Sequence, residues 1–213
     1  MMTRIYDISQ TLGPSLPVWP GDTSFQIQTT WEMNDNCPVQ VSKLTLSTHS
    51  GTHADAPSHY HDQGVSMEQV ALTPYLGECL VLHARPSNGL VSFDDLSLTR
   101  GHPDALPQRV LIKTFAEFPH KNWPDFRGID PKLIDTLANR KVRLIGTDTP
   151  SLDPETSKTM DAHKAVQKAG MAILEGLVLE EVPEGRYELI ALPLKILGAD
   201  ASPVRAILRS LTS

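Results

Sequence analysis

The sequence predicts a mixed α/β (α+β) fold: a strand-rich sheet that curls towards a barrel, with helices on its outside. Stretches rich in β-branched and apolar residues outnumber helical patterns. Seventeen prolines divide the chain into short elements joined by loops. A chain of 213 residues is long enough for one domain with a substantial core and short for two, so we expect a single domain over residues 1–213.

The expected elements follow from local patterns. In the segment 131–139, Pro131 occupies a typical first helical position, and Leu133, Ile134 and Leu137 have helical spacing. A second helix is expected at 160–169, ended by Gly170, and a third at about 66–72. The expected strands are 4–8, 38–48, 79–83, 109–113, 142–146, 171–179 and 187–191.

Composition and charge exclude several classes of protein. The net charge is −6 and the basic residues are scattered, which argues against a nucleic-acid partner. The most apolar stretches contain charges and are too short to span a bilayer, and the N-terminus lacks the apolar core of a signal peptide. Cys37 and Cys79 lack metal-type spacing and are expected to be reduced thiols. We therefore expect a cytoplasmic protein without a membrane or nucleic-acid partner.

Histidines gather in one short segment. Four of the eight, His49, His53, His59 and His61, lie within residues 49–61 and, like Asp55, at odd positions. Because alternate residues of a strand face the same side, His49, His53 and Asp55 could converge on one point. Two imidazoles and a carboxylate form the ligand set of catalytic zinc sites. The alternative is a surface loop that carries histidines by chance.

A second candidate site is a carboxylate in an apolar run. Glu175 lies inside residues 171–179, and a buried carboxylate is costly unless a cation meets it. The neighbouring Gly176 would allow another group to approach closely. His163, in the helix that leads into this run, could supply a further ligand. Alternatively, Glu175 lies on an exposed edge strand or pairs with a basic residue, and His163 is a solvated helix residue.

A family resemblance follows from these motifs. The segment 49–59, HSGTHADAPSH, resembles the HxGxHxDxPxH signature of the cyclase family of metal-dependent hydrolases. The resemblance covers nearly the whole chain. The segments WPGDT at 19–23, TPSLDP at 149–154 and SKTMDAH at 157–163 are similar to the formamidase branch of that family.

The resemblance implies a site with two zinc ions. His49, His53 and Asp55 would hold one ion. Asp55 would bridge to the second ion, which His163 and Glu175 would complete. The resemblance also implies the family's swivelling β/β/α fold and a homodimer or larger assembly.

The remaining roles concern the substrate. His59 matches the family's proton donor and acceptor, whereas the signature does not require His61, which is expected to be an outer or surface residue. Trp19 matches the aromatic residue that contacts the substrate; without the resemblance it would be taken as a plug over the core.

Asp148 is expected to be structural or to orient a ligand histidine. Lys158 and Asp161 are expected on a solvated face or at a helix cap.

The implied reaction is hydrolysis of N-formylkynurenine, an aryl formamide, to kynurenine and formate in tryptophan breakdown. A general acid must protonate the poor anilide leaving group, and an imidazole can do so near neutral pH. One rival is another cyclase-family hydrolase, such as an isatin-hydrolase-like enzyme that uses a different divalent metal. The other rival is a metal-binding module without catalysis.

Overall fold

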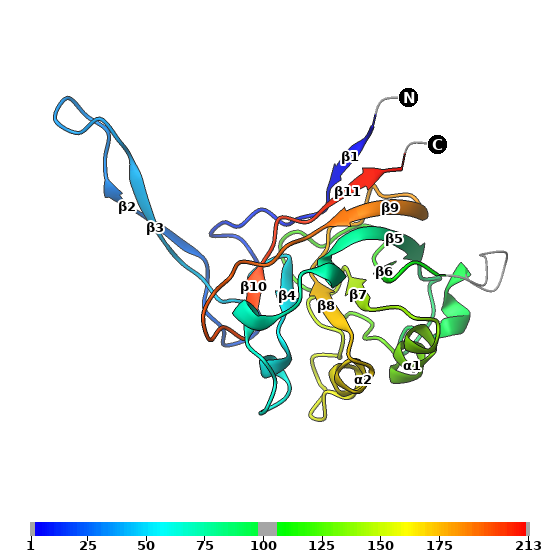
Figure 1. The fold of residues 1–213 in the computed structure, drawn as a ribbon. Coiled ribbons are helices and arrows are strands. Elements are labelled where there is room, and N and C mark those ends of the chain that lie inside the picture. Colours follow the sequence, from blue (N-terminus) through cyan, green and yellow to red (C-terminus); the bar gives the residue numbers. More distant parts are fainter. Residues whose placement is uncertain (1–2, 98–105, 212–213) are drawn as a thin grey trace.

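The computed structural model describes residues 3–97 and 106–211, and its main feature is a curled, nine-stranded mixed sheet (Figure 1). The sheet runs in the order β1-β11-β9-β5-β6-β7-β8-β4-β10. Its strands are β1 (Ile5–Asp7), β4 (His53–Asp55), β5 (Leu76–His83), β6 (Arg109–Lys113), β7 (Leu144–Thr147), β8 (Ala172–Glu175), β9 (Gly185–Ile190), β10 (Ala201–Pro203) and β11 (Ile207–Ser210).

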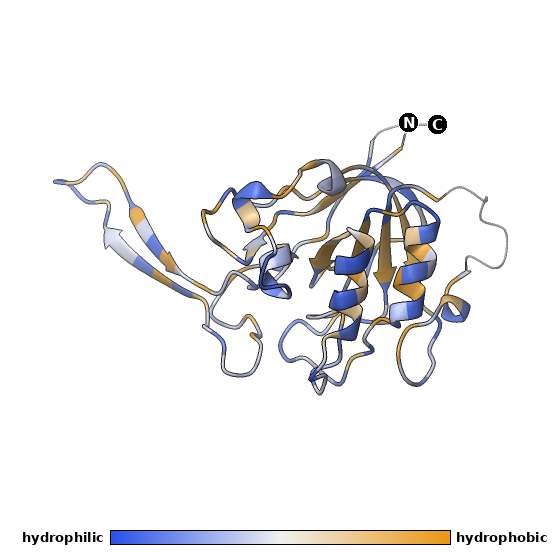
Figure 2. Ribbon diagram, turned by 60° about the horizontal axis from the view of Figure 1, so that its bottom comes forward, coloured by the Kyte–Doolittle hydropathy of each residue, from blue (hydrophilic) through white to orange (hydrophobic). Residues whose placement is uncertain are grey.

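The centre of the sheet is parallel and carries the helices. β5, β6, β7 and β8 run parallel, and their residues are mostly buried and apolar, as expected for strands covered on both faces. The helices α1 (Pro131–Asn139) and α2 (Asp161–Ala169) connect β6 to β7 and β7 to β8. Figure 2 shows their apolar sides turned towards the sheet. One apolar core lies between these helices and the sheet, and a second lies against the outer, antiparallel strands.

Antiparallel strands extend the sheet on both sides. β4 lies between β8 and β10 and is antiparallel to both. Its register places His53 opposite Glu175 and Asp55 opposite Ile173. A three-residue strand that is buried throughout therefore brings two candidate ligands beside a third.

A two-stranded hairpin stands apart from this sheet. It consists of β2 (Gln26–Trp31) and β3 (Val41–Thr45), and Figure 1 shows it projecting from the body of the molecule. Every residue of both strands is exposed. No helix within residues 3–97 and 106–211 has the length and apolarity needed to cross a membrane.

The predicted mixed α/β fold with outer helices is confirmed. The first helix has the predicted bounds, and the second begins one residue later than predicted. The third helix is wrong, because residues 66–72 contain only one turn of 3₁₀ helix at Met67–Gln69. The predicted strand 171–179 is too long: β8 ends at Glu175, because Gly176 adopts a positive φ of 64°. β2, β4, β10 and β11 were not predicted.

Candidate metal centre

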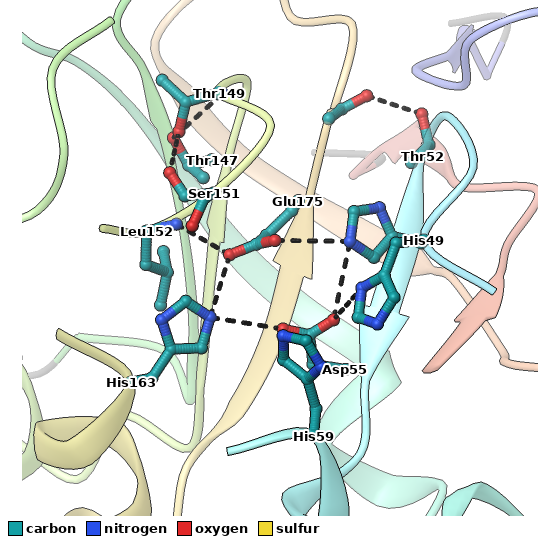
Figure 3. Close-up of polar contacts among 12 residues, drawn as sticks. His49, Thr52, Asp55, His59, Thr147, Thr149, Ser151, Leu152, His163 and Glu175 are labelled. Atoms are coloured by element: carbon teal, nitrogen blue, oxygen red, sulfur yellow. Dashed lines mark hydrogen bonds and ion pairs between the residues drawn. The ribbon is translucent and has the colours of Figure 1, made fainter. Parts of the chain in front are cut away.

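Five predicted ligands converge where β4, β8 and α2 meet (Figure 3). His53 and Asp55 come from β4, Glu175 ends β8, and His163 lies in the first turn of α2. His49 comes from the turn that precedes β4, so the prediction that it shares one face of a strand with the other two is wrong. The turn nevertheless brings its ring beside Asp55.

Asp55 lies at the centre of the cluster. Its Oδ1 is 3.2 Å from His49 Nδ1 and 3.5 Å from His53 Nε2, and its Oδ2 is 3.4 Å from His163 Nε2. The side chain is buried, and neither oxygen forms a hydrogen bond of good geometry. Each oxygen therefore faces a different set of imidazoles.

Glu175 completes the cluster beside His53, its cross-strand neighbour. Its Oε2 lies 3.3 Å from His53 Nε2 and its Oε1 lies 3.5 Å from His163 Nε2. Its Oε1 also accepts a hydrogen bond of 2.7 Å from the backbone N–H of Leu152, which fixes the carboxylate. His53 Nδ1 lies 3.0 Å from the carbonyl oxygen of Gly51, so this nitrogen carries the proton and Nε2 is free to act as a ligand. The buried carboxylate thus lies beside two imidazoles, with which it could share the cation that the sequence predicts for it.

The cluster stabilises positive charge. Burial opposes protonation of His49, but the carboxylates of Asp55 and Asp200 outweigh it and raise the pKa of His49 to about 9. Burial likewise opposes protonation of His163, and Asp153 and Asp55 raise its pKa to about 10. Burial alone would raise the pKa of Asp55, yet the adjacent rings of His163 and His49 hold that pKa well below its usual range.

Two carboxylates that contact the ligand histidines were not predicted from the sequence. Asp153 Oδ2 lies 2.6 Å from His163 Nδ1, and the Asp153 carboxylate accepts hydrogen bonds from the backbone N–H groups of Ala162 and His163. Asp200 Oδ2 lies 3.1 Å from His49 Nε2. A carboxylate on the second ring nitrogen orients a ligand imidazole. No local pattern marked Asp153 or Asp200, because each meets its histidine only in the folded chain.

Asp148 does not orient a histidine. Its carboxylate accepts hydrogen bonds from the backbone N–H and the hydroxyl of Thr114 and from the backbone N–H of Phe115. Burial raises the pKa of Asp148 to about 6 in spite of these bonds. Its role is to fix the chain that follows β6, so the structural part of its predicted role is confirmed and the orienting part is wrong.

His59 and His61 lie in different environments. The His59 ring centroid is 4.2 Å from that of His49, and its Nδ1 is 3.6 Å from Asp200 Oδ2. Burial lowers the pKa of His59. Within residues 3–97 and 106–211, two sets of side chains could hold a metal ion. His53, Asp55 and Glu175 form one set, and His49, Asp55 and His59 form the other. His61 lies 3.8 Å from Asp62, and its side chain is 38% exposed.

A cavity of about 580 Å³ opens above the cluster. Trp19 lines it together with His49, His53, His59, His163 and Glu175, whereas His61 does not. Trp19 is 37% exposed and meets Phe126 edge to face, with ring centroids 6.4 Å apart. It is a wall of the cavity rather than a plug over the core. A second wall, Trp123, was not foreseen in the sequence.

Comparison with known proteins settles the family. A family model described as putative cyclase matches residues 6–154, more than half of the chain. The chain belongs to the cyclase family. The predicted resemblance is thereby confirmed.

Two relatives in this family are similar along the whole chain. Kynurenine formamidase of Maricaulis maris (strain MCS10) is 54% identical over 211 residues, which cover 99% of this chain and 100% of that protein. Kynurenine formamidase of Erythrobacter litoralis (strain HTCC2594) is 53% identical over 209 residues, which cover 98% of this chain and 94% of that protein.

Solved structures agree with this assignment. A potential metal-dependent hydrolase with cyclase activity is 28% identical, with a TM-score of 0.82 and full coverage of both chains. Isatin hydrolase A of Labrenzia aggregata, bound to benzyl benzoate, is 23% identical, with a TM-score of 0.80 and coverage of 99% of this chain and 94% of that one. At this identity the second likeness shows a shared fold only.

The cluster in this cyclase-family chain fits a divalent metal. His53 Nε2 and both carboxylate oxygens of Asp55 are buried without a hydrogen-bond partner. Buried polar atoms without partners are costly, and metal coordination satisfies them. Imidazole nitrogens and carboxylate oxygens are the ligands of hydrolytic zinc sites. The chain thus has the fold of metal-dependent hydrolases and candidate sites for a metal.

Proposed function

We propose that this chain hydrolyses N-formylkynurenine to kynurenine and formate. Full-length identity of 54% and 53% to two kynurenine formamidases is the observation that carries the substrate. The site supports the same reaction, because a cavity with two tryptophan walls opens directly above a buried cluster of imidazoles and carboxylates. Such a cavity suits an aryl formamide.

The proposed cofactor is two zinc ions per chain. His49, His53 and Asp55 would hold one ion, and Asp55, His163 and Glu175 would hold the other. The bridging role is supported by the two oxygens of Asp55, which face different imidazoles. When bound, the ions supply Lewis acidity that lowers the pKa of water and polarises the formyl carbonyl.

The proposed general acid and base is His59. It lines the cavity with 30% of its side chain exposed, so it can reach both water and substrate. Burial lowers its pKa, which favours the neutral ring that accepts a proton from the attacking water. The His59 ring then delivers this proton to the anilide nitrogen as the C–N bond of the formamide breaks. Trp19 would lie against the aryl ring and orient it.

We further propose that residues 1–213 form one domain and that two copies form a homodimer in the cytoplasm. The single domain is supported by β1 and β11, from opposite ends of the chain, which pair in one sheet. The dimer is supported by the β2–β3 hairpin, whose Ile27, Trp31 and Leu44 are more than half exposed. A free hairpin is only marginally stable in water, and exposed apolar patches mark interaction sites.

The activity is tested by comparing two substrates on the zinc-loaded protein. N-Formylkynurenine should be cleaved with a much higher kcat/KM than isatin, and removal of the metal with a chelator should abolish the activity until zinc is restored. Efficient cleavage of isatin with poor cleavage of N-formylkynurenine would assign the chain to the cyclic-amide hydrolases instead. Metal binding without hydrolysis of either compound would indicate a binding module.

A further inference from the structure

The proposed substrate has two chemically different ends. The aryl formamide is the end that reacts at the histidine cluster. The other end is an α-amino acid, with a carboxylate and an ammonium group that would lose hydration on entering the cavity. Charged groups that lose water need charged or hydrogen-bonding partners. None of the roles described so far supplies a partner for that end.

The cavity offers one basic side chain that forms no ion pair within the described residues and is not part of the cluster. Among the described residues that line it, Lys158 is the single lysine or arginine. It is exposed and forms no ion pair with any residue that the structure describes. The described arginines that form ion pairs are Arg127, Arg186, Arg205 and Arg209. The Lys158 ammonium is therefore available to an anion that enters the cavity.

The backbone that carries Lys158 is fixed relative to the cluster. Just before it, the N–H of Ser157 donates a hydrogen bond of 2.8 Å to the carbonyl oxygen of Pro154. Just after it, the N–H of Met160 donates a bond of 3.2 Å to the Ser157 hydroxyl. α2 begins at the next residue and carries His163. The loop is thus anchored on both sides, while the long side chain of Lys158 can still adapt to a ligand.

The acidic residues that line the cavity differ in their hydrogen bonds. Asp22 accepts a hydrogen bond of 2.6 Å from the backbone N–H of Thr23. The Asp153 carboxylate forms a hydrogen bond with the His163 ring, and the Glu175 carboxylate accepts one from the backbone N–H of Leu152. Both carboxylates therefore belong to the cluster or orient its members. Glu155 is exposed, forms no ion pair within the described chain, and lies three residues before Lys158. It also borders an adjoining cavity of about 390 Å³. A positive and a negative side chain, both uncommitted, therefore lie on one short loop at the cavity.

We infer that Lys158 binds the α-carboxylate of the substrate and that Glu155 faces its α-ammonium group. This inference rests on the proposed function and extends it to the amino-acid end of N-formylkynurenine. The expectation that Lys158 merely lies on a solvated face is then replaced by a role in specificity. Lys158 touches neither the formyl group nor the water that attacks it, so its contribution lies in binding.

The experiment compares two substrates on three proteins. N-Formylkynurenine is paired with N-formyl-2-aminoacetophenone, which keeps the aryl formamide and lacks the amino-acid end. The proteins are the wild type, Lys158→Met, which keeps an apolar stem, and Lys168→Met, a matched control at an exposed position of α2 away from the cavity. Zinc content and thermal unfolding of each protein establish that it is loaded and folded.

Lys158→Met should lower kcat/KM for N-formylkynurenine about 10- to 100-fold, mainly through KM, as expected when a hydrogen bond between charged groups is lost. Cleavage of the acetophenone analogue should not change, and Lys168→Met should resemble the wild type with both substrates. Binding of the product kynurenine, followed by fluorescence, should weaken in parallel.

Four outcomes would overturn the inference. An equal loss with both substrates would make Lys158 a structural residue, and no loss with either would show that it makes no contact. If the wild type cleaves the analogue and not N-formylkynurenine, the amino-acid end has no site here at all. If the loaded wild type cleaves neither aryl formamide, the proposed function fails, and the inference fails with it.

Discussion

Two antiparallel strand pairs of this chain invert the usual relation between polarity and burial. β4 and β8 are buried, although they carry His53, Asp55 and Glu175. β2 and β3 are exposed along their whole length, although they carry apolar side chains such as Ile27 and Trp31. Both pairs are antiparallel, so the difference lies in what covers the side chains.

The side chains of each strand pair would be stabilised by a partner: those of the buried pair by a cation, and those of the exposed pair by a covering surface. Buried carboxylates and imidazoles cost free energy unless a cation satisfies them, and Asp55 has no hydrogen-bond partner in the described structure. Covering the exposed apolar side chains of the hairpin with another surface lowers the free energy, because apolar area is removed from water. The buried pair thus supports a metal at the candidate site, and the exposed pair is the surface on which the proposed homodimer rests.

The largest expected effect separates chemistry from metal binding at the buried pair. His59→Ala should lower kcat by about 10²–10⁴, the usual contribution of a general acid or base, while zinc content stays at the wild-type level. The control is His61→Ala, which lies two residues away and outside the cavity lining, and should retain activity. Parallel loss of zinc and activity in His59→Ala would make His59 a ligand, in agreement with the second candidate ligand set.

A smaller effect is expected at the exposed pair. Trp31→Lys places a charge on the apolar surface of the hairpin and should raise the dissociation constant of the dimer by about 30-fold or more, the effect of losing an interface anchor. Leu90→Lys, at an exposed apolar position of the body, is the matched control. Analytical ultracentrifugation across a concentration series measures both variants. A monomeric wild type, or a Trp31→Lys variant that associates as the wild type does, would refute the hairpin interface.

The smallest expected effect concerns the cavity wall. Trp19→Ala should lower the preference for N-formylkynurenine over a small alkyl formamide by about 2- to 10-fold, because an aromatic contact contributes ~0.5–1.5 kcal/mol beyond its buried area. Zinc content should not change, since Trp19 is no ligand. The ratio of kcat/KM values for the two substrates is the measurement. An unchanged ratio would mean that the aryl ring lies against another wall, with Trp123 as the candidate.

The sequence predicted those parts of the molecule that have local causes. α1 was predicted from a proline and the spacing of three apolar residues, and β6 from a continuous apolar run; both have the predicted bounds. The members of the candidate metal cluster were predicted from the histidine spacing and from a family resemblance. The structure brings all five together.

Other features depend on contacts between distant segments and have no local signal. β4 and β10 are three-residue strands that exist because they pair with each other and with β8. Asp200 reaches His49 across 151 positions of sequence. The hairpin was half predicted, as the strand 38–48, but nothing in its composition indicated that it would project from the body. His49 lies in a turn before β4, so it does not share a strand face with His53 and Asp55 as the odd-numbered spacing predicted.

The most direct test of the account is the zinc content of two ligand variants. After loading with zinc and removal of the unbound metal, elemental analysis should give two ions per chain for the wild type and about one for Glu175→Gln. Asp55→Asn should lose most of both ions, because the oxygens of Asp55 face both groups of imidazoles. Circular dichroism should show that each variant is folded. A folded Asp55→Asn protein with the zinc content of the wild type would contradict the account.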